Sequence, residues 1–402
     1  MPEPDPAPPS QLLDRLNTLG RRHDVLRAET QRAQTGEALA RTRLGEALVS
    51  ALAARSAAEA AARAAIFAGR LSAGRTRLRP DRRNRIRRLI ERLAGRLGPW
   101  GQALVIARSG VWRTKSPGLG GLLRALPAMA AYAGQGANPA AAPAALFDQA
   151  FYLRRNPDVA ATGSSPLTHY LHTGGREGRA PHPLLDPAAY ERQVGDELAA
   201  TGLTALEHYL RLGAARGLAP HPLFDPAGYV VQAPELAQTG ETPLDHYLRA
   251  GARQDLSPHP LFQPSFYRRR ALGLAPGTNA LLHYLTEGSD LGLQPHPLFD
   301  PSWYRERYLG LDGQEPLQHF VGHGGHEDLD PSPWFDAARY KALRGADRPA
   351  DLDPLTDYLR GGAWAVAEPS SGFHAFAYLA AHPELAAEGL TPLEHWARRS
   401  AP

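Results

Sequence analysis

Hydrophobic positions follow two different periods along the chain, and the change between them divides the sequence. Residues 12–68 contain no proline, and a seam of positions recurs at alternating spacings of four and three, leucine-rich first and alanine-rich later. Such a heptad pattern predicts a coiled coil or a helical hairpin over residues 11–70, and a single partly solvated helix is the alternative. The seam comprises Leu12, Leu16, Leu19, His23, Leu26, Thr30, Ala33, Glu37, Ala40, Leu44, Ala47, Ala51, Ala54, Ala58, Ala61 and Ala65.

From residue 147 the pattern repeats every 36–39 residues, in seven units that we number 1–7. Each unit has an apolar first anchor, a tyrosine five residues later, and a pair such as "HY" that begins 15–18 residues after the tyrosine. The interval from this pair to the next first anchor is always 16 residues. The first anchors are Phe147, Leu185, Phe224, Phe262, Phe299, Phe335 and Phe373. The tyrosines are Tyr152, Tyr190, Tyr229, Tyr267, Tyr304, Tyr340 and Tyr378. The pairs begin at His169, His208, His246, His283, His319, Asp357 and His395.

The sequence pattern of each unit predicts two helices. Residues such as Asp225, placed before a proline, can cap the first helix, and Thr204 with Glu207 forms a capping box for the second. "NPDVAATG" (156–163) suggests one short additional helical turn between them, and a glycine five residues after the histidine suggests a helix C-terminal turn. Two short helices cannot bury their own aromatic residues, so neighbouring units must stack. The sequence therefore predicts an all-α tandem array over residues 146–402, with Phe and Tyr anchors such as Phe147 and Tyr229 at its joints.

The joint itself reads "PHPLFDPAGY" in its clearest copy, from residue 220. His221 alone could be taken for a ligand or a catalyst. Its counterparts stand at the same joint of other units, and Ser332 replaces it in a later copy. A residue that the repeat exchanges for serine is better interpreted as part of the joint. The counterparts are His182, His259 and His296.

The remaining segments differ in composition and charge. Residues 1–10 are proline-rich and predicted to be disordered, residues 71–133 form a basic amphipathic and apolar helical segment, and residues 134–145 are predicted to be a linker. Residues 1–146 hold 24 Lys and Arg against 10 Asp and Glu, whereas the remainder holds 21 against 31. This asymmetry suggests that the basic part meets an anionic surface and that the array does not.

A helix around Ile86 and Leu93 would be surrounded by arginines. It could lie on an anionic bilayer, with the arginines at phosphate level, or it could pack as an ordinary surface helix. Nucleic acid is a third option but is not expected, because no nucleic-acid-binding fold accompanies the segment. The arginines that could contact a membrane or another anion are Arg82, Arg83, Arg85, Arg87, Arg88, Arg92 and Arg96.

Candidate chemistry is sparse. The chain has no cysteine, and no phosphate-binding loop, nucleophile elbow or zinc-protease motif. The histidines of the "HY" pairs occur once per unit and are expected to donate a ring N–H to a backbone carbonyl rather than to bind metal. The spacing of His319, His323 and His326 would suit a metal only if their helix were continuous. The "DLD" triplets at 328–330 and 351–353 resemble a metal–nucleotide motif, but they precede prolines in predicted loops. We predict no catalytic residue, metal or cofactor.

Unit 1, "LFDQAFYLRRNPDVAATGSSPLTHYLHTGGREGRAPHPLLD" (146–186), resembles a repeat found beside the catalytic domain of bacterial glycosyltransferases and in other polysaccharide-biosynthesis proteins. A similar repeat occurs in some large secreted calcium-binding surface proteins, and a coiled coil ahead of the repeats is also similar to those glycosyltransferases. Later units depart from the pattern: Asp357 replaces histidine, and "EPSSGF" (368–373) replaces "PHPLF". No α/β catalytic domain follows the units, so the resemblance implies a context, surface polysaccharide assembly, rather than transferase activity.

Three functions follow as hypotheses. The first is a non-enzymatic scaffold that oligomerises through its coiled coil and docks glycosyltransferases or glycan through its units. The second is a glycan-binding module, in which tryptophans stack on sugars, and the third is a divergent or truncated glycosyltransferase. Without a secretory signal or an apolar span, we expect a cytoplasmic protein, with peripheral attachment to the inner membrane face as a further option. The candidate tryptophans are Trp303, Trp334, Trp364 and Trp396.

Overall fold

The computed structural model describes residues 47–55, 98–112, 119–163, 165–239, 241–366 and 368–400, together with the single residues 27, 43 and 58. This part of the chain is all-α and contains no β-strand, as the sequence predicts. Residues 1–10, most of the predicted coiled coil and all seven candidate arginines between residues 82 and 96 lie outside the described residues.

Every unit begins with a short helix that follows a capping residue. The carboxylate of Asp225 accepts a hydrogen bond from the Ala227 backbone N–H, and the next residue, Pro226, needs no partner for its nitrogen. These first helices are α5 (Gln149–Arg155), α8 (Pro187–Val194), α11 (Pro226–Gln232), α14 (Pro264–Arg270), α16 (Pro301–Tyr304), α18 (Ala337–Arg344) and α20 (Ala375–Ala381). In units 1, 2, 3 and 7 the additional turn follows as α6 (Pro157–Thr162), α9 (Asp196–Thr201), α12 (Leu236–Thr239) and α21 (Leu385–Glu388).

The second helix of each unit carries the "HY" pair. Thr204 and Glu207 form the predicted capping box, in which each side chain accepts a hydrogen bond from the other residue's backbone N–H. These helices are α7 (Pro166–His169), α10 (Ala205–His208), α13 (Pro243–Arg249), α15 (Ala280–His283), α17 (Pro316–His319), α19 (Pro354–Leu359) and α22 (Pro392–Ser400). Four of them continue into a wider π-helical turn: η1 (Tyr170–Gly174), η2 (Tyr209–Gly213), η4 (Tyr284–Gly288) and η6 (Phe320–Gly324).

The glycine that ends this turn is needed for space. Gly213 does not have the positive φ of a left-handed helix cap. A Cβ atom at this position would lie 1.9 Å from the hydroxyl of Tyr190, which enters from the first helix of the same unit. A Cβ atom at the corresponding glycine of units 1 and 3–6 would lie 1.8–2.0 Å from the tyrosine hydroxyl of the same unit. The sequence pattern is therefore explained by close packing of the two helices rather than by a C-terminal turn.

Three rings form the centre of a typical unit. In unit 3, Phe224 lies 5.3 Å from Tyr229 and 5.6 Å from Tyr247 between ring centroids, and the two tyrosines meet edge to face at 5.7 Å. All three side chains are buried. Edge-to-face and tilted pairs at these distances are favourable arrangements of aromatic rings. The other first anchors and tyrosines predicted at the joints are also buried, namely Phe147, Tyr152, Phe262, Tyr267, Phe299 and Tyr304.

Helices α3 (Gly98–Ser109) and α4 (Leu119–Ala133) cap the first unit and belong to the same core. The pair Ala131–Tyr132 begins 16 residues before Phe147, which is the interval from the start of the HY pair to the next first anchor in the repeat. The Tyr132 hydroxyl accepts a hydrogen bond from the Leu167 backbone N–H at 3.2 Å. The corresponding Tyr170 makes the same contact with Leu206, at 3.4 Å. Residues 119–146 thus pack like the second half of a unit.

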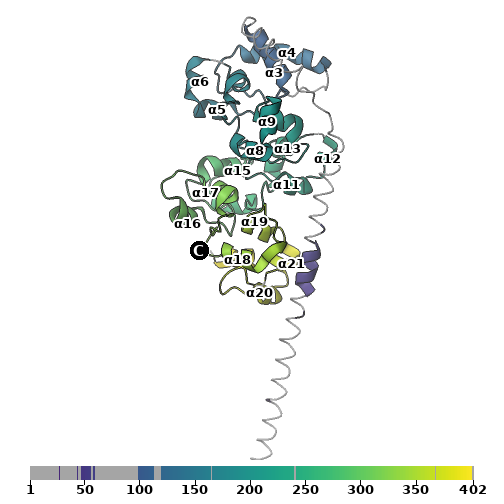
Figure 1. The fold of residues 1–402 in the computed structure, drawn as a ribbon, viewed down its shortest axis with the longest axis vertical. Coiled ribbons are helices and arrows are strands. Elements are labelled where there is room, and N and C mark those ends of the chain that lie inside the picture. Colours follow the sequence, from purple (N-terminus) through teal and green to yellow (C-terminus); the bar gives the residue numbers. More distant parts are fainter. Residues whose placement is uncertain are drawn as a thin grey trace, which may run out of the picture.

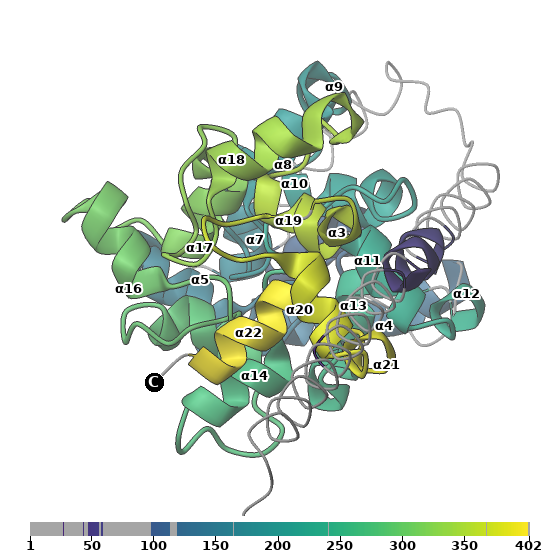
Figure 2. The same cartoon turned by 90° about the horizontal axis from the view of Figure 1, so that it is seen from below.

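The units wind about the long axis of the molecule. Figure 1 shows them stacked from α3 and α4 at one end to α20 and α21 at the other, and Figure 2 shows the winding in the view from below. Side chains 131–135 residues apart in the sequence form hydrogen bonds, for example Gln318 with Asp186. Because a unit has 36–39 residues, one turn of this superhelix takes about three and a half units.

A helical segment at residues 47–55 lies along the last unit, beside α21 (Figure 1). Its Leu52 is buried with Leu379 and Leu385. The heptad-seam positions Ala47 and Ala51 are instead exposed. The face that packs on the array is therefore different from the face predicted to form the coiled coil.

Candidate binding groove

Successive turns of the superhelix are joined by a recurring polar junction. The capping residue of one first helix bonds to a second helix about three units later. Gln318 Nε2 donates to Asp186 Oδ2 at 2.9 Å, and Arg360 pairs with Asp225. At the third junction Gln263 Nε2 donates to the carboxylate of Glu394 at 2.7 Å. The capping residues thus hold neighbouring turns together in addition to starting their own helices.

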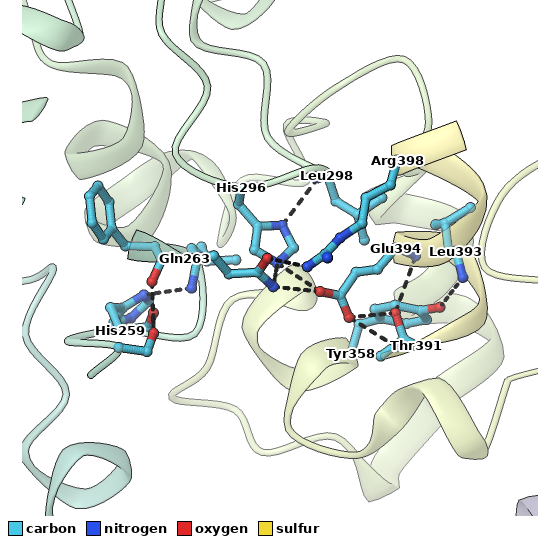
Figure 3. A network of polar contacts seen from close by, with 12 residues as sticks. His259, Gln263, His296, Leu298, Tyr358, Thr391, Leu393, Glu394 and Arg398 are labelled. Carbon is cyan, nitrogen blue, oxygen red and sulfur yellow. Dashed lines mark hydrogen bonds and ion pairs between the residues drawn. The ribbon is translucent and has the colours of Figure 1, made fainter. Parts of the chain in front are cut away.

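The junction between units 4 and 7 is the most extensive (Figure 3). Arg398 Nη2 donates to Gln263 Oε1 at 2.6 Å, while His296 Nε2 lies 3.2 Å from Glu394 Oε1. The second carboxylate oxygen of Glu394 accepts hydrogen bonds from the Thr391 backbone N–H and hydroxyl, at 3.1 and 2.9 Å. The side chains of His296 and Glu394 are both buried, at 0% and 4% exposure.

The electrostatics of this junction favour an ionised carboxylate. Burial alone would raise the pKa of Glu394, but hydrogen bonding and charge from His296, together with the two bonds from Thr391, hold it at about 2. Both of its carboxylate oxygens are engaged, one by Gln263 and His296 and the other by Thr391. Its role is structural, because loss of one partner leaves a buried polar group without its hydrogen bond.

The joint histidines adopt one tautomer. Nδ1 of His221 accepts a hydrogen bond from the Leu223 backbone N–H at 3.0 Å, which places the ring proton on Nε2. His182, His259 and His296 make the same contact, and the Ser332 hydroxyl oxygen takes this role in its own unit. Burial lowers the pKa of His182 and His221 to about 4 and that of His259 to about 3. The rings of His182, His221 and His259 are therefore neutral near pH 7.

The histidines of the "HY" pairs have a different partner from the one predicted. Nδ1 of His169, His208, His246, His283, His319 and His395 lies 2.7–2.9 Å from the hydroxyl of the tyrosine in the same unit. In unit 6 the Tyr340 hydroxyl donates to the Asp357 carboxylate at 2.6 Å. Because a carboxylate can only accept, the equivalent tyrosines are assigned as donors to the histidines. A buried hydroxyl, rather than a backbone carbonyl, therefore satisfies this nitrogen.

A groove of about 630 Å³ opens between units 1–2 on one turn and units 4–5 on the next. Arg154, Arg155 and the joint residue His221 line it from the first turn, and Glu287 and Asp290 line it from the second. It is within the size range of small-molecule sites, and its lining is mainly polar. Sequence reasoning missed this groove because its walls come from units that are far apart along the chain.

A smaller cavity of about 270 Å³ lies between unit 3 and units 6–7. Asp225, Arg360 and Glu394 contribute to its lining, and so do Leu52 and Arg55 of the segment at 47–55. Asp225, Arg360 and Glu394 belong to the junctions described above.

The remaining candidates have structural surroundings. His319 and His323 lie 5.9 Å apart between ring centroids, and the described residues contain no cluster of three or more side chains suited to a metal. In the "DLD" triplets, Asp330 accepts from the Ala337 backbone N–H at 2.8 Å and Asp353 caps α19. The four candidate tryptophans are all partly buried, and Trp334 packs edge to face on Trp396 at 5.1 Å.

None of the helices in the described part of the chain has the length and apolar character needed to cross a membrane. Comparison of the chain with protein-family models, curated proteins and solved structures found no match.

Proposed function

We propose that the protein is a non-enzymatic scaffold for bacterial surface polysaccharide assembly, and that its superhelix docks glycosyltransferases or their glycan. The observation that carries this proposal is the use of its ionisable groups. Each HY histidine bonds a tyrosine of its own unit, and the buried acids Asp225 and Glu394 link one turn to the next. Such an array offers a stiff surface along its units, as other stacked helical repeats do. The polysaccharide context comes from the resemblance of the repeat.

A glycan-binding module remains the second candidate, although two of its four candidate tryptophans, Trp334 and Trp396, are engaged with one another. The observation in its favour is the polar groove between units 1–2 and 4–5.

In this proposal the chain forms a homo-oligomer through the coiled coil and stays on the cytoplasmic side, held at the inner membrane face by the arginines between residues 82 and 96. The exposed seam position Ala51 supports an oligomer because the array leaves that face uncovered. As the protein lacks cysteine, Ala51→Cys can be compared directly with Ala53→Cys, an exposed position outside the seam. Mild oxidation should give a covalent dimer of the first variant and much less of the second. Equal crosslinking of both would argue against the seam.

The docking function is tested by chemical crosslinking in cells that express the tagged full-length chain, followed by quantitative mass spectrometry. Glycosyltransferases or other polysaccharide-assembly proteins should be enriched over an untagged control strain. Recovery of the full-length chain from membranes with none of these proteins enriched would overturn the proposal.

A further inference from the structure

The groove between units 1–2 and 4–5 has walls of opposite hydrogen-bonding character. Arg154 and Arg155 on the first-turn wall are exposed, and neither has an ion pair within the described residues. On the opposite wall, the Glu287 and Asp290 side chains are 68% and 89% exposed and lie 3.7 Å from their own basic neighbours. One wall thus presents donors and the other presents acceptors, with space between them that no side chain fills.

His221 adds a buried donor to the first-turn wall. Its ring is 3% exposed, its Nδ1 is used by the Leu223 backbone, and its Nε2 has no hydrogen-bond partner within the described residues. At the equivalent joint, His296 Nε2 meets the carboxylate oxygen of Glu394 (Figure 3). Buried polar groups are nearly always hydrogen-bonded. The residue at the corresponding position beside His221 is Gln318, whose side chain donates to Asp186 instead, so Nε2 of His221 is left for a ligand in the groove.

The groove is open at this turn for a reason visible in the sequence. At the three closed junctions a polar residue of the later second helix meets the capping residue, as Gln318 meets Asp186. For the capping residue of unit 1, Asp148, the position equivalent to Gln318 is Leu282, which cannot form such a bond. No such bond can form between Asp148 and Leu282, and Arg154 and Leu285, a few residues after them in the chain, line the groove.

We propose that this groove binds a short oligosaccharide. A sugar hydroxyl donates and accepts at the same oxygen, so one ligand can satisfy both the arginine wall and the carboxylate wall. The volume of about 630 Å³ suits a small ligand rather than a folded partner. This inference rests on the proposed function, whose glycan it places at particular residues.

The test is isothermal titration of the full-length chain with a panel of neutral and acidic oligosaccharides, and with acidic and basic peptides of similar length. His221→Ser removes the Nε2 donor while keeping an acceptor for the backbone, as Ser332 does in its own unit. The matched control is His259→Ser, at a joint none of whose residues lines the groove. Arg154→Ala combined with Arg155→Ala is compared with Arg269→Ala combined with Arg270→Ala, the equivalent positions of unit 4.

At least one oligosaccharide should bind the wild-type chain, and each groove variant should weaken it about tenfold, the effect of losing one hydrogen bond in a desolvated site. The control variants should change affinity by less than about twofold. Absence of binding by every oligosaccharide, equal weakening by the control variants, or binding of peptides alone would overturn the inference. Because partner capture in cells is measured separately, a scaffold that docks enzymes but binds no sugar is distinguishable from failure of the proposed function.

Discussion

The contact between Gly213 and Tyr190 provides the sharpest test of how a unit is built. A Cβ atom introduced by Gly213→Ala would lie 1.9 Å from the tyrosine hydroxyl oxygen and 3.0 Å from the ring carbon that bears it. The Tyr190 ring is fully buried, packs edge to face on Tyr209 at 6.1 Å, and bonds His208 at 2.8 Å. It cannot swing into solvent, so the two helices must separate or the hydroxyl must leave its partner.

The magnitude follows from three contributions. Overpacking a core costs about 1–3 kcal/mol, and a buried hydrogen bond that is broken costs about 1–3 kcal/mol. Alanine is better than glycine in a helix by about 1 kcal/mol, which opposes the other two. We therefore expect Gly213→Ala to lower the free energy of unfolding by about 3 kcal/mol. Gly322→Ala is the control, because a Cβ there meets nothing within 4 Å and should be neutral or slightly stabilising.

Tyr190→Phe, alone and combined with Gly213→Ala, completes a double-mutant cycle. The free energy of unfolding of each variant is measured by urea unfolding followed by circular dichroism. Removing the hydroxyl should cost about 1–2 kcal/mol alone but relieve part of the clash, so the two changes should couple favourably by at least about 1 kcal/mol. Additive effects, or a Gly213→Ala variant as stable as wild type, would refute the view that the glycine is needed for the tyrosine hydroxyl.

Three further perturbations probe the joints and the turns. Histidines of the unfolded chain take up protons below about pH 6.5, whereas the buried rings of His182, His221 and His259 do so only at about pH 3–4. The free energy of unfolding should therefore fall by about 2 kcal/mol per histidine at pH 5 and be regained at pH 8. An acid titration of the urea midpoint that stays flat would contradict this. Glu394→Ala should destabilise the chain by about 3–5 kcal/mol and Glu394→Gln by less, as measured by thermal unfolding. Leu52→Asp should release residues 47–55 from the last unit, seen as faster amide hydrogen exchange there with the array unchanged.

The contacts that sequence reasoning predicted well are the local ones. A capping residue acts within its own first turn, so Asp225 and the Thr204–Glu207 box could be placed without tertiary information. The partner of an HY histidine was beyond reach, since the tyrosine that bonds it is 15–18 residues away and comes from the other helix of the unit. A signal existed for residues 119–146, because the pair Ala131–Tyr132 begins 16 residues before Phe147, but alanine stands where a histidine would reveal the match.

The junctions between superhelical turns join residues about three units apart, so they depend on the summed length of those units. This dependence explains which intervals of the repeat are fixed. The 16-residue interval, counted from the first residue of the pair, never varies because the ring that follows this residue and the first anchor of the next unit are both buried. Variation is confined to the connection between the two helices of a unit. The connection between the two helices is shortest in units 4 and 5, which have no additional α-helical turn there. Such connections can change length at little cost when they run over the surface. The register between turns, and with it the groove beside His221, is thereby preserved while the outside of the array changes.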